Sequence, residues 1–313
     1  MTETSSRNTT CPLCGKVIAP KTCFRNGAER VRECSACLGG FVFPRDSGDQ
    51  LLSRYSPAYF HEKYDLNRQS EYLNMKSWNR KAALCLDRVE KLRGGQTGLL
   101  LDLGCGRGWF LEAARKRGWS VRGLELCPEI AKHTMEQLGE QVYIGSLFDT
   151  PLPSTTFDLV TMFDVIEHLE SPVGALQICH RILKPGGALV LSTPNFRGLG
   201  CRLLGAKAFG IWPDEHIVYF GPASIRQALW LAEFTRIEIA SREIYPENVA
   251  TLISRLLGRN GGGTGGVGGS KEEVWSVKRP FRNSMILRGC RAVANWIFAA
   301  IPIGDELLAF AVK

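Results

Sequence analysis

One stretch near residue 100 constrains the fold of this chain more than any other. An apolar run, Leu99 to Leu103, is followed at once by a turn with glycines at 104, 106 and 108 and by the start of an amphipathic segment. Glycine permits positive φ angles and lets a ligand approach the backbone closely. A strand, a glycine-rich turn and a helix start in succession are typical of nucleotide-type cofactor sites in doubly wound α/β proteins. The stretch therefore predicts a parallel sheet with a cofactor at the carboxyl end of its first strand.

Two acidic residues narrow the kind of cofactor. Asp102 stands just before the first glycine, where its carboxylate would repel a pyrophosphate and attract a cation. Glu125 ends a second predicted strand over 120–125, about twenty residues after the glycine turn, where an acid binds ribose hydroxyls. Together the two carboxylates predict a nucleoside cofactor that carries a positive charge.

These residues carry a family resemblance. The run from Asp102 to Gly108, with Glu125, resembles the first two motifs of class I S-adenosylmethionine (SAM) dependent methyltransferases. Residues 163–169, Phe-Asp-Val-Ile-Glu-His-Leu, are similar to the end of that family's fourth strand, also in ubiquinone-biosynthesis O-methyltransferases, and residues 183–195 are similar to its fifth strand. The resemblance covers about residues 99–245. It implies a Rossmann-like, doubly wound, seven-stranded sheet whose last strand is antiparallel, and SAM as the cofactor.

The resemblance also implies which residues contact SAM. They lie at the end of the first strand, in the glycine loop, and after the second, third and fourth strands: Asp102, Gly104, Cys105, Gly106, Gly108, Trp109, Glu125, Leu126, Ser146, Leu147, Phe163 and Asp164. Many members carry an aspartate for the adenine amino group where this chain has Ser146. We therefore expect Ser146, Leu147 and Asp149 to share that contact.

Candidate catalytic residues follow the fourth predicted strand. Asp164, Glu167 and His168 come at the sheet edge where ligands bind in open α/β folds. His168 is the first candidate for a general base. In the ubiquinone-type enzymes a similar acid-x-x-Glu-His arrangement is associated with a divalent metal, so the resemblance implies one at these three residues. The alternative is structural: Glu167 and His168 would cap the next helix and brace the loop.

A second histidine is a rival base. His216 lies in the segment 212–220, after the fifth predicted strand and before a helix. The segment resembles a Glu-His-x-x-x-Phe stretch of methyltransferases encoded with bacterial glycan-assembly enzymes, where the region faces the acceptor. A purely structural role for this histidine is the alternative.

The cysteines predict a metal site near the N-terminus. Of 11 cysteines, four form two Cys-x2-Cys pairs, Cys11 with Cys14 and Cys34 with Cys37, separated by nineteen residues. This spacing is typical of a zinc ribbon, here over residues 1–45. Four thiolates close the coordination of the ion, so the Zn²⁺ would be structural. Cys23 is expected to be spare, and the remaining thiols are interpreted as small buried apolar residues.

The rest of the chain divides around the predicted sheet. Residues 46–98, rich in tyrosine, are interpreted as a helical lid over the cofactor, with a helix over 77–92; the alternative is that the rings pack against the sheet. Residues 99–313 form the predicted methyltransferase domain. Its expected helices are at about 108–117, 128–138, 172–183 and 222–232, and its strands at about 99–103, 120–125, 142–145, 157–162, 188–193, 235–244 and 306–313.

A long insertion over 247–305 lies between the last two predicted strands. It contains a glycine-rich run over 258–270, interpreted as a linker, and a basic amphipathic segment over about 284–300. A basic amphipathic helix with tryptophan is typical of peripheral contact with an anionic membrane surface. The alternative is that this helix covers the substrate cleft or a dimer partner.

Charge and hydropathy favour a soluble chain. The net charge is +8 with a pI near 9.0, which permits nucleic acid, anionic lipid or phosphorylated partners. No run reaches the roughly 18 apolar residues of a membrane span, and the polar start does not resemble a signal peptide. These features predict a cytoplasmic protein that can be peripheral to the inner membrane surface.

The leading functional hypothesis is a SAM-dependent methyltransferase that O-methylates a small molecule, a sugar or a lipid-linked glycan intermediate. A quinone or other aromatic O-methyltransferase is the first alternative, since residues 164–168 resemble that group. An RNA-binding methyltransferase and a SAM-binding pseudoenzyme are further alternatives. The sequence argues against nucleic acid, because no Asn/Asp-Pro-Pro-Tyr type motif is present.

Overall fold

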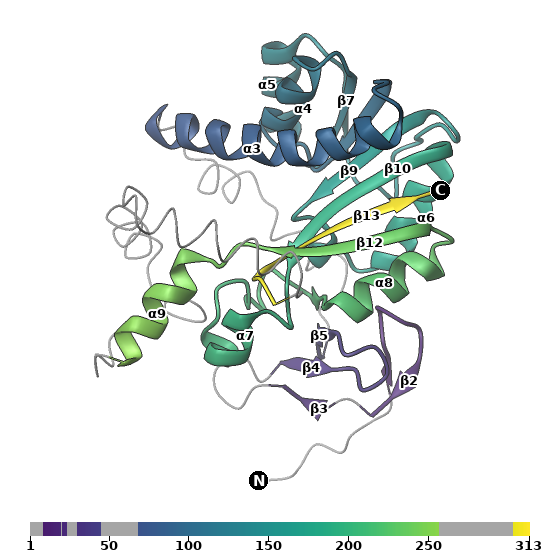
Figure 1. The fold of residues 1–313 in the computed structure, drawn as a ribbon. Helices are drawn as coiled ribbons and strands as arrows, with labels where there is room; N and C mark the ends of the chain where they lie inside the picture. The colour runs from purple at the N-terminus through teal and green to yellow at the C-terminus, as the bar shows by residue number, and fades with distance from the viewer. Residues whose placement is uncertain (1–8, 20, 24–29, 45–67, 257–302) are drawn as a thin grey trace.

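A seven-stranded sheet organises the chain in the computed structural model, which describes residues 9–19, 21–23, 30–44, 68–256 and 303–313 (Figure 1). Its strand order is β12-β13-β10-β9-β6-β7-β8. Five neighbouring strands are parallel, whereas β13 runs antiparallel to both β10 and β12. The strands are β6 (Leu99–Leu103), β7 (Ser120–Glu125), β8 (Val142–Ile144), β9 (Phe157–Phe163), β10 (Leu183–Pro194), β12 (Thr235–Arg242) and β13 (Glu306–Val312). The predicted seven-stranded sheet with an antiparallel last strand is confirmed.

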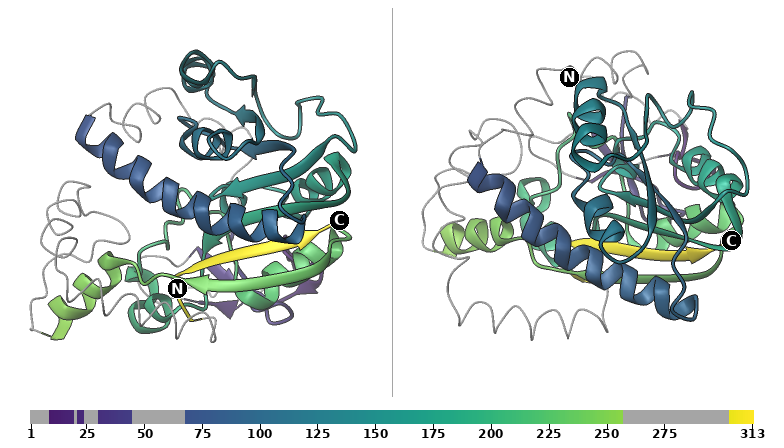
Figure 2. Two further views of the ribbon diagram at one scale, coloured as in Figure 1. Left: turned by 45° about the horizontal axis from the view of Figure 1, so that its top comes forward. Right: turned by 90° about the horizontal axis from the view of Figure 1, so that it is seen from above.

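Helices cover both faces of the sheet, which is why the central strands β6 and β9 are buried along almost their whole length. Successive residues of β6 point to opposite faces: Leu100 packs with one helical layer and Leu101 with the other. The first layer holds α3 (Arg68–Leu92), α4 (Trp109–Arg115) and α5 (Pro128–Leu138), and the second holds α6 (Pro172–Ile182) and α8 (Pro222–Leu231). Figures 1 and 2 show α3 crossing one side of the sheet and α8 lying on the other.

The predicted helices at 128–138 and 172–183 are confirmed to within a residue. The helix expected to start at 77 begins at Arg68 instead. The sequence interpretation missed α7 (Leu199–Leu204) and a two-residue strand, β11 (Val218–Tyr219). Three predicted segments lie outside the described residues: most of the tyrosine-rich segment, the glycine-rich linker and the basic amphipathic helix. No helix among the described residues is long and apolar enough to span a bilayer.

The expected insertion starts as a helix, α9 (Pro246–Leu256), that is bonded to the domain. Asn248 donates a hydrogen bond to Asp305, which directly precedes β13, over 2.8 Å. The Asn248 side-chain oxygen accepts a hydrogen bond from the backbone N–H of Phe209 over 2.7 Å. This start of the insertion therefore belongs to the packed domain.

The described N-terminal residues, 9–19, 21–23 and 30–44, form what we call the cysteine element. Its strands are β1 (Thr9–Thr10), β2 (Val17–Ile18), β3 (Lys21–Thr22), β4 (Val31–Glu33) and β5 (Gly40–Val42). A four-stranded sheet runs β11-β5-β4-β3, so the element shares a sheet with a strand from the middle of the chain. Phe41 lies in the same apolar cluster as Phe220 and Ile225. The separate mini-domain suggested by the sequence is thus joined to the large domain by β-pairing and by core packing.

Candidate functional site

A cavity of about 1060 Å³ lies at the carboxyl ends of β6, β7 and β9. The residues predicted to contact SAM line it, with one exception: Gly108 is not among the lining residues. Gly108 has a φ of 72°, and a Cβ there would lie 2.6 Å from a Thr134 methyl carbon. Its absent side chain therefore lets the loop pack against α5. The candidate catalytic residues Asp164, Glu167, His168 and His216 line the same cavity.

The glycine loop is held in left-handed conformations. Gly104 and Gly106 have φ angles of 70° and 51°, which L-residues with a Cβ rarely adopt. At Gly104 a Cβ would also lie 2.5 Å from a methyl carbon of Val165. The backbone N–H groups of Gly104 and Cys105 both donate to the Leu124 carbonyl, at 2.8 and 3.1 Å. These bonds hold the turn against β7, and Gly104, Cys105 and Gly106 line the cavity.

Glu125 is held in place by the backbone around it. Its Oε2 accepts a hydrogen bond from the N–H of Gly106 over 2.9 Å, and its Oε1 accepts one from the N–H of Cys127 over 3.0 Å. Burial raises the pKa of this carboxyl, although both backbone bonds oppose the rise. Each carboxylate oxygen has a second lone pair. The fixed orientation therefore suits Glu125 to accept bonds from a pair of vicinal hydroxyls.

Asp102 is a buried acid beside the loop. Its Oδ1 accepts a hydrogen bond from the Thr161 hydroxyl over 2.6 Å, and 4% of the residue is exposed. Burial raises its pKa to about 7. A buried carboxyl with so few partners becomes easier to ionise when a cation binds next to it. The cavity end at β6 therefore favours a cationic ligand.

Residues that follow β8 also line the cavity. Ser146, Leu147 and Asp149 all line the cavity, as expected for the adenine contact. The Ser146 hydroxyl oxygen accepts a hydrogen bond from the N–H of Phe148 over 3.2 Å. A serine that accepts this local bond can still donate its hydroxyl hydrogen to a ligand.

An ion-pair network that the sequence interpretation missed lies beneath Asp164. The Lys81 ammonium donates to the Ser192 hydroxyl at 2.7 Å and to Glu306 at 2.9 Å, and it lies 3.4 Å from Asp164. Burial opposes the charge on Lys81, but Asp164 and Glu306 outweigh it and raise the lysine pKa. The Asp164 carboxylate also accepts a bond from Ser192 over 2.9 Å. Asp164 is thus connected to α3 through Lys81 and to β10 through Ser192, and no local sequence motif identifies these two partners.

The second cluster of the cavity contains Glu167, His168 and His216, whose ligand atoms lie within 4.8 Å of one another. The structure places His216 in this cluster, where the sequence suggested Asp164. Each imidazole has its Nδ1 2.9 Å from a backbone carbonyl oxygen, of Glu215 for His168 and of Gly210 for His216. A carbonyl can only accept, so each Nδ1 carries a hydrogen, and in the neutral imidazole the Nε2 carries the lone pair.

Glu167 completes this cluster as a buried acid. The residue is 1% exposed, and its Oε2 has no hydrogen-bond partner among the described residues. Burial, reinforced by the charge of Asp164, raises its pKa to about 8. Two imidazole lone pairs beside an unpartnered carboxylate oxygen can accept a proton or hold a divalent cation. The carbonyl-bonded Nδ1 atoms are typical of metal-binding histidines.

Aromatic rings form the wall next to His216. The centroid of the Phe209 ring lies 4.6 Å from that of Trp212 and 5.1 Å from that of Tyr245, and the Trp212 ring lies 5.2 Å from His216. All three rings line the cavity. Trp212 stands in the segment singled out from the sequence, whereas Phe209 and Tyr245 carry no local signal. The Phe209 ring packs edge to face with the other two rings, and the three together give the cavity an apolar aromatic wall.

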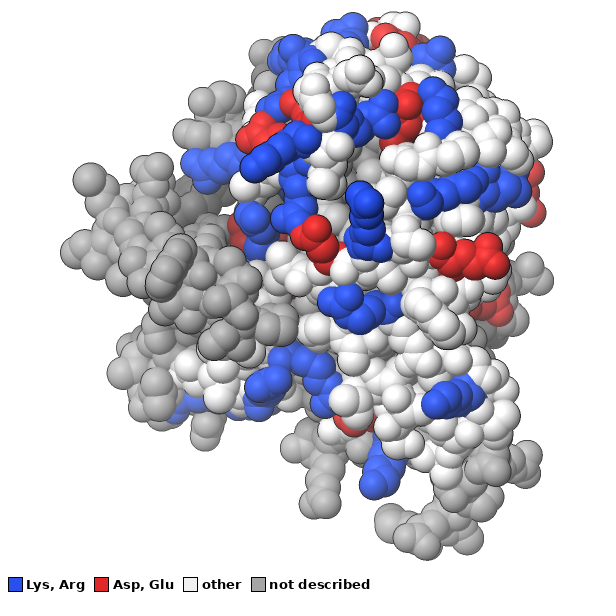
Figure 3. Space-filling view, turned by 45° about the vertical axis from the view of Figure 1, so that its right-hand side comes forward, with Lys and Arg blue, Asp and Glu red and all other residues white. Residues whose placement is uncertain are grey.

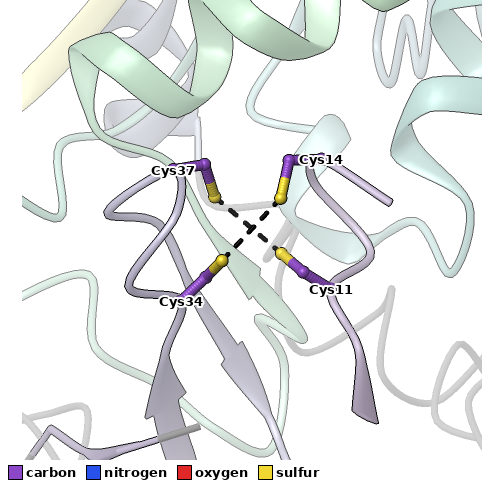
Figure 4. Close-up of side chains that lie close together, drawn as sticks. All are labelled: Cys11, Cys14, Cys34 and Cys37. Carbon is purple, nitrogen blue, oxygen red and sulfur yellow. Dashed lines mark hydrogen bonds between the residues drawn. The ribbon is translucent and has the colours of Figure 1, made fainter. Parts of the chain in front are cut away.

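The four predicted metal-binding cysteines converge in the cysteine element (Figure 4). The Sγ atoms of Cys11 and Cys37 are 3.8 Å apart, and those of Cys14 and Cys34 are 3.7 Å apart. Four thiolates at about 2.3 Å from one tetrahedral ion would lie about 3.8 Å from each other, so the cluster fits Zn²⁺. Hydrogen bonding from Cys37 lowers the pKa of Cys11 to about 5. Burial raises the pKa of Cys14 to about 11, and hydrogen bonding to Cys11 with burial raises the pKa of Cys37, so these two thiols become thiolates only when a cation binds beside them.

Comparisons with known proteins agree with these observations. A family model described as a methyltransferase domain matches residues 76–239. A ubiquinone biosynthesis O-methyltransferase from Alkalilimnicola ehrlichii is 36% identical over 121 residues, which are 36% of this chain and 48% of that protein. One from Vibrio parahaemolyticus is 29% identical over 187 residues, 56% of this chain and 77% of that protein. The match thus spans about half of the first relative and three quarters of the second.

One solved structure also aligns with most of the chain. It is a SAM-dependent methyltransferase from Archaeoglobus fulgidus, with 19% identity and a TM-score of 0.47, and it covers 78% of this chain and 99% of its own.

Proposed function

The chain belongs to the methyltransferase-domain family whose model it matches, and from this premise we propose that it transfers the methyl group of SAM to a hydroxyl of a small ring-bearing acceptor. The observation that carries the proposal is a single cavity with two chemically different ends. One end holds the glycine loop, Asp102 and Glu125, and the other holds Glu167, His168 and His216.

The first end suits each part of SAM. Glu125 is oriented to accept the two ribose hydroxyls. Each hydrogen bond from a ribose hydroxyl to this carboxylate contributes about 1.5–3 kcal/mol. Asp102 provides a buried negative charge for a cationic cofactor. Ser146 and Asp149 offer polar partners for the adenine, and Leu147, Trp109 and Leu126 offer apolar contact.

The second end suits removal of a hydroxyl proton. In the reaction an acceptor oxygen forms a bond to the methyl carbon while the sulfur–carbon bond breaks, and S-adenosylhomocysteine leaves as a neutral thioether. The hydroxyl proton goes to a basic atom of the cluster: an Nε2 of His168 or His216, or Oε2 of Glu167. A general base in this position contributes about 10²–10⁴ in rate. Holding oxygen, methyl carbon and sulfur in line contributes further through positioning.

Two metals fit the donor sets of the chain. Zn²⁺ at Cys11, Cys14, Cys34 and Cys37 would be structural, because four thiolates leave it no open position. Glu167, His168 and His216 would hold a divalent cation, which lowers the pKa of a hydroxyl bound to it.

The aromatic wall supports a ring-shaped acceptor. Phe209, Trp212 and Tyr245 can stack on an aromatic ring or on the apolar face of a sugar. The relatives named as ubiquinone biosynthesis O-methyltransferases favour an aromatic, quinone-type ring. A sugar of a lipid-linked glycan is the second candidate, because the segment that resembles glycan-cluster methyltransferases delivers His216 to the cavity.

The face shown in Figure 3 carries charges of both signs. Lys and Arg side chains are interspersed there with acidic residues and with uncharged surface. Nucleic-acid binding typically uses a basic patch or stripe.

The test uses SAM labelled in its methyl group and extracts from cells that lack this gene, with a catechol and a lipid-linked sugar as defined acceptors. Label in an organic-soluble aromatic product would support the proposal, and label in the glycan fraction would select the second candidate. Addition of Mg²⁺ or Mn²⁺ after chelation tests the cation at the histidine cluster. Label confined to RNA or protein, or SAM binding with no label in any fraction, would refute the proposed acceptor class.

A further inference from the structure

We propose that the cysteine element positions His216, so that metal at the four cysteines sets the geometry of the histidine end of the cavity and leaves the SAM end unchanged. Calling the histidine end the acceptor end rests on the proposed function. The positioning itself rests on contacts between the cysteine element and the residue that follows His216.

Ile217 is held from both sides. Its carbonyl oxygen accepts a hydrogen bond from the N–H of Val42 in β5 over 2.9 Å. The Ile217 N–H donates to the carbonyl oxygen of Glu167, also over 2.9 Å. One peptide neighbour of His216 therefore connects the cysteine element to the 3₁₀ turn at Ile166–His168. Any displacement of β5 acts on two of the three residues in the histidine cluster.

Strand pairing extends this connection beyond one bond. In the antiparallel pair of β5 and β11, Phe41 lies opposite Val218 and Gly40 lies opposite Tyr219. The next residue, Phe220, is fully buried, and its carbonyl accepts a hydrogen bond from the N–H of Phe196 over 2.8 Å. The segment that begins at His216 is therefore sandwiched between the cysteine element and the large domain.

The metal ligands lead directly into β5. The second cysteine pair closes a turn in which the N–H of Leu38 donates to the carbonyl of Cys34 over 2.8 Å, and the N–H of Cys34 donates to the carbonyl of Gly39 over 2.9 Å. Gly39 packs so closely on the turn of the first cysteine pair that a Cβ there would collide with the Leu13 side chain. The start of β5 is thus set by both halves of the cysteine cluster.

The cysteine element depends on its metal for this role. Its strands are two or three residues long, and four of its buried side chains are the clustered cysteines. So small a unit has no separate core, because most of its buried residues pack at the edge of the large domain's core, and a structural Zn²⁺ contributes about 10–16 kcal/mol in comparable units. Loss of the metal is therefore expected to release β5 from β11.

The described part of the cysteine element shares an apolar core with Leu103 and Leu124 but does not reach the cofactor contacts themselves. No described residue of the cysteine element lines the cavity. The glycine loop and Glu125 are instead bonded to each other and to β7. An effect of metal loss should therefore reach the histidine cluster and stop short of the cofactor contacts.

The experiment compares full-length Cys34→Ser with Cys23→Ser, which removes a thiol of the same element that lies outside the cluster. The readouts are zinc content, SAM affinity by calorimetry, and imidazole signals by nuclear magnetic resonance, assigned with His→Gln variants of the five histidines. Cys34→Ser should lose zinc, keep SAM affinity within twofold, and shift the signals of His216 and His168 but not that of His133. Cys23→Ser should match the parent protein in every readout.

A second variant isolates the mechanical link. Val42→Pro removes the N–H that bonds to Ile217 and keeps all four cysteines. It should retain zinc and shift the same two imidazole signals. In the acceptor assay, both Cys34→Ser and Val42→Pro should raise the acceptor KM or lower kcat at least tenfold, with the KM for SAM unchanged.

Two results would overturn the inference. In the first, Cys34→Ser loses zinc while the His216 and His168 signals stay in place. In the second, SAM affinity falls with zinc, which would make the cysteine element a support of the whole domain. Neither readout requires an acceptor, so a failure of the proposed methyl transfer would leave this test intact.

Discussion

Replacing Glu125 by alanine should weaken SAM binding by about 1.5–3 kcal/mol, the contribution of a hydrogen bond to a charged group. The structure explains why the loss should be near the upper end of this range. Two backbone N–H groups, of Gly106 and Cys127, hold the Glu125 carboxylate at 2.9 and 3.0 Å, so it is oriented before the ribose arrives. Because 1.4 kcal/mol corresponds to a tenfold change in affinity, the expected increase in Kd is about 12-fold to 160-fold.

The matched control is Glu136→Ala, which removes an exposed glutamate from the adjoining helix α5. Titration calorimetry of both variants with SAM and with S-adenosylhomocysteine gives the comparison, because both ligands carry the same ribose. Circular dichroism and urea unfolding establish that each variant is folded at the temperature used. A folded Glu125→Ala protein with the parent Kd for both ligands would refute the assignment of Glu125 to the ribose.

Three further expectations concern other parts of the site. Burial raises the pKa of Asp102 to about 7 in the free protein, so this carboxyl is largely protonated at pH 6 and ionised at pH 8, and SAM affinity should rise about tenfold over this range. S-adenosylhomocysteine lacks the sulfonium charge and should show a smaller change; an equal change would contradict the reasoning. Gly104→Ala should lower the free energy of unfolding, measured by urea denaturation, by about 1–3 kcal/mol more than Gly139→Ala does. Both glycines have positive φ, but only at Gly104 would the new Cβ meet a neighbour within 4 Å. Equal losses would show that the loop accommodates the methyl group. Lys81→Met should lower the free energy of unfolding by about 3 kcal/mol, because the substitution leaves Glu306 beside Asp164 without a cation. Adding Glu306→Gln should recover most of this loss. A double variant no more stable than the single one would argue against the network.

Much of the SAM end was predictable because its chemistry is local. The glycine loop, Asp102 and the strand before it lie within ten residues, and Glu125 ends the next strand. Strand periodicity and glycine spacing carry this information directly. One predicted cofactor contact of the loop differs in the structure: Gly108 packs against α5 and is not among the cavity-lining residues.

The histidine end was harder to predict because its residues come from separate segments. Glu167 and His168 meet His216 across nearly fifty residues of sequence, and no pattern in either segment specifies the partner. Lys81 and Glu306 are farther apart still, at opposite ends of the described domain. Local periodicity reports which face of an element is buried, but not which distant element covers that face.

By itself the sequence determined the short-range features of this protein: the strand–loop–helix unit with its two acids, the alternation of helices and strands, and the two cysteine pairs. Such features follow from the spacing of residues along one element or one turn. The tertiary structure alone decided that His216 replaces Asp164 in the cluster with Glu167, and that β11 completes the sheet of the cysteine element. Both depend on long-range packing around Ile217. Here β5 pairs with β11, and the backbone N–H and carbonyl of Ile217 bond to Glu167 and Val42.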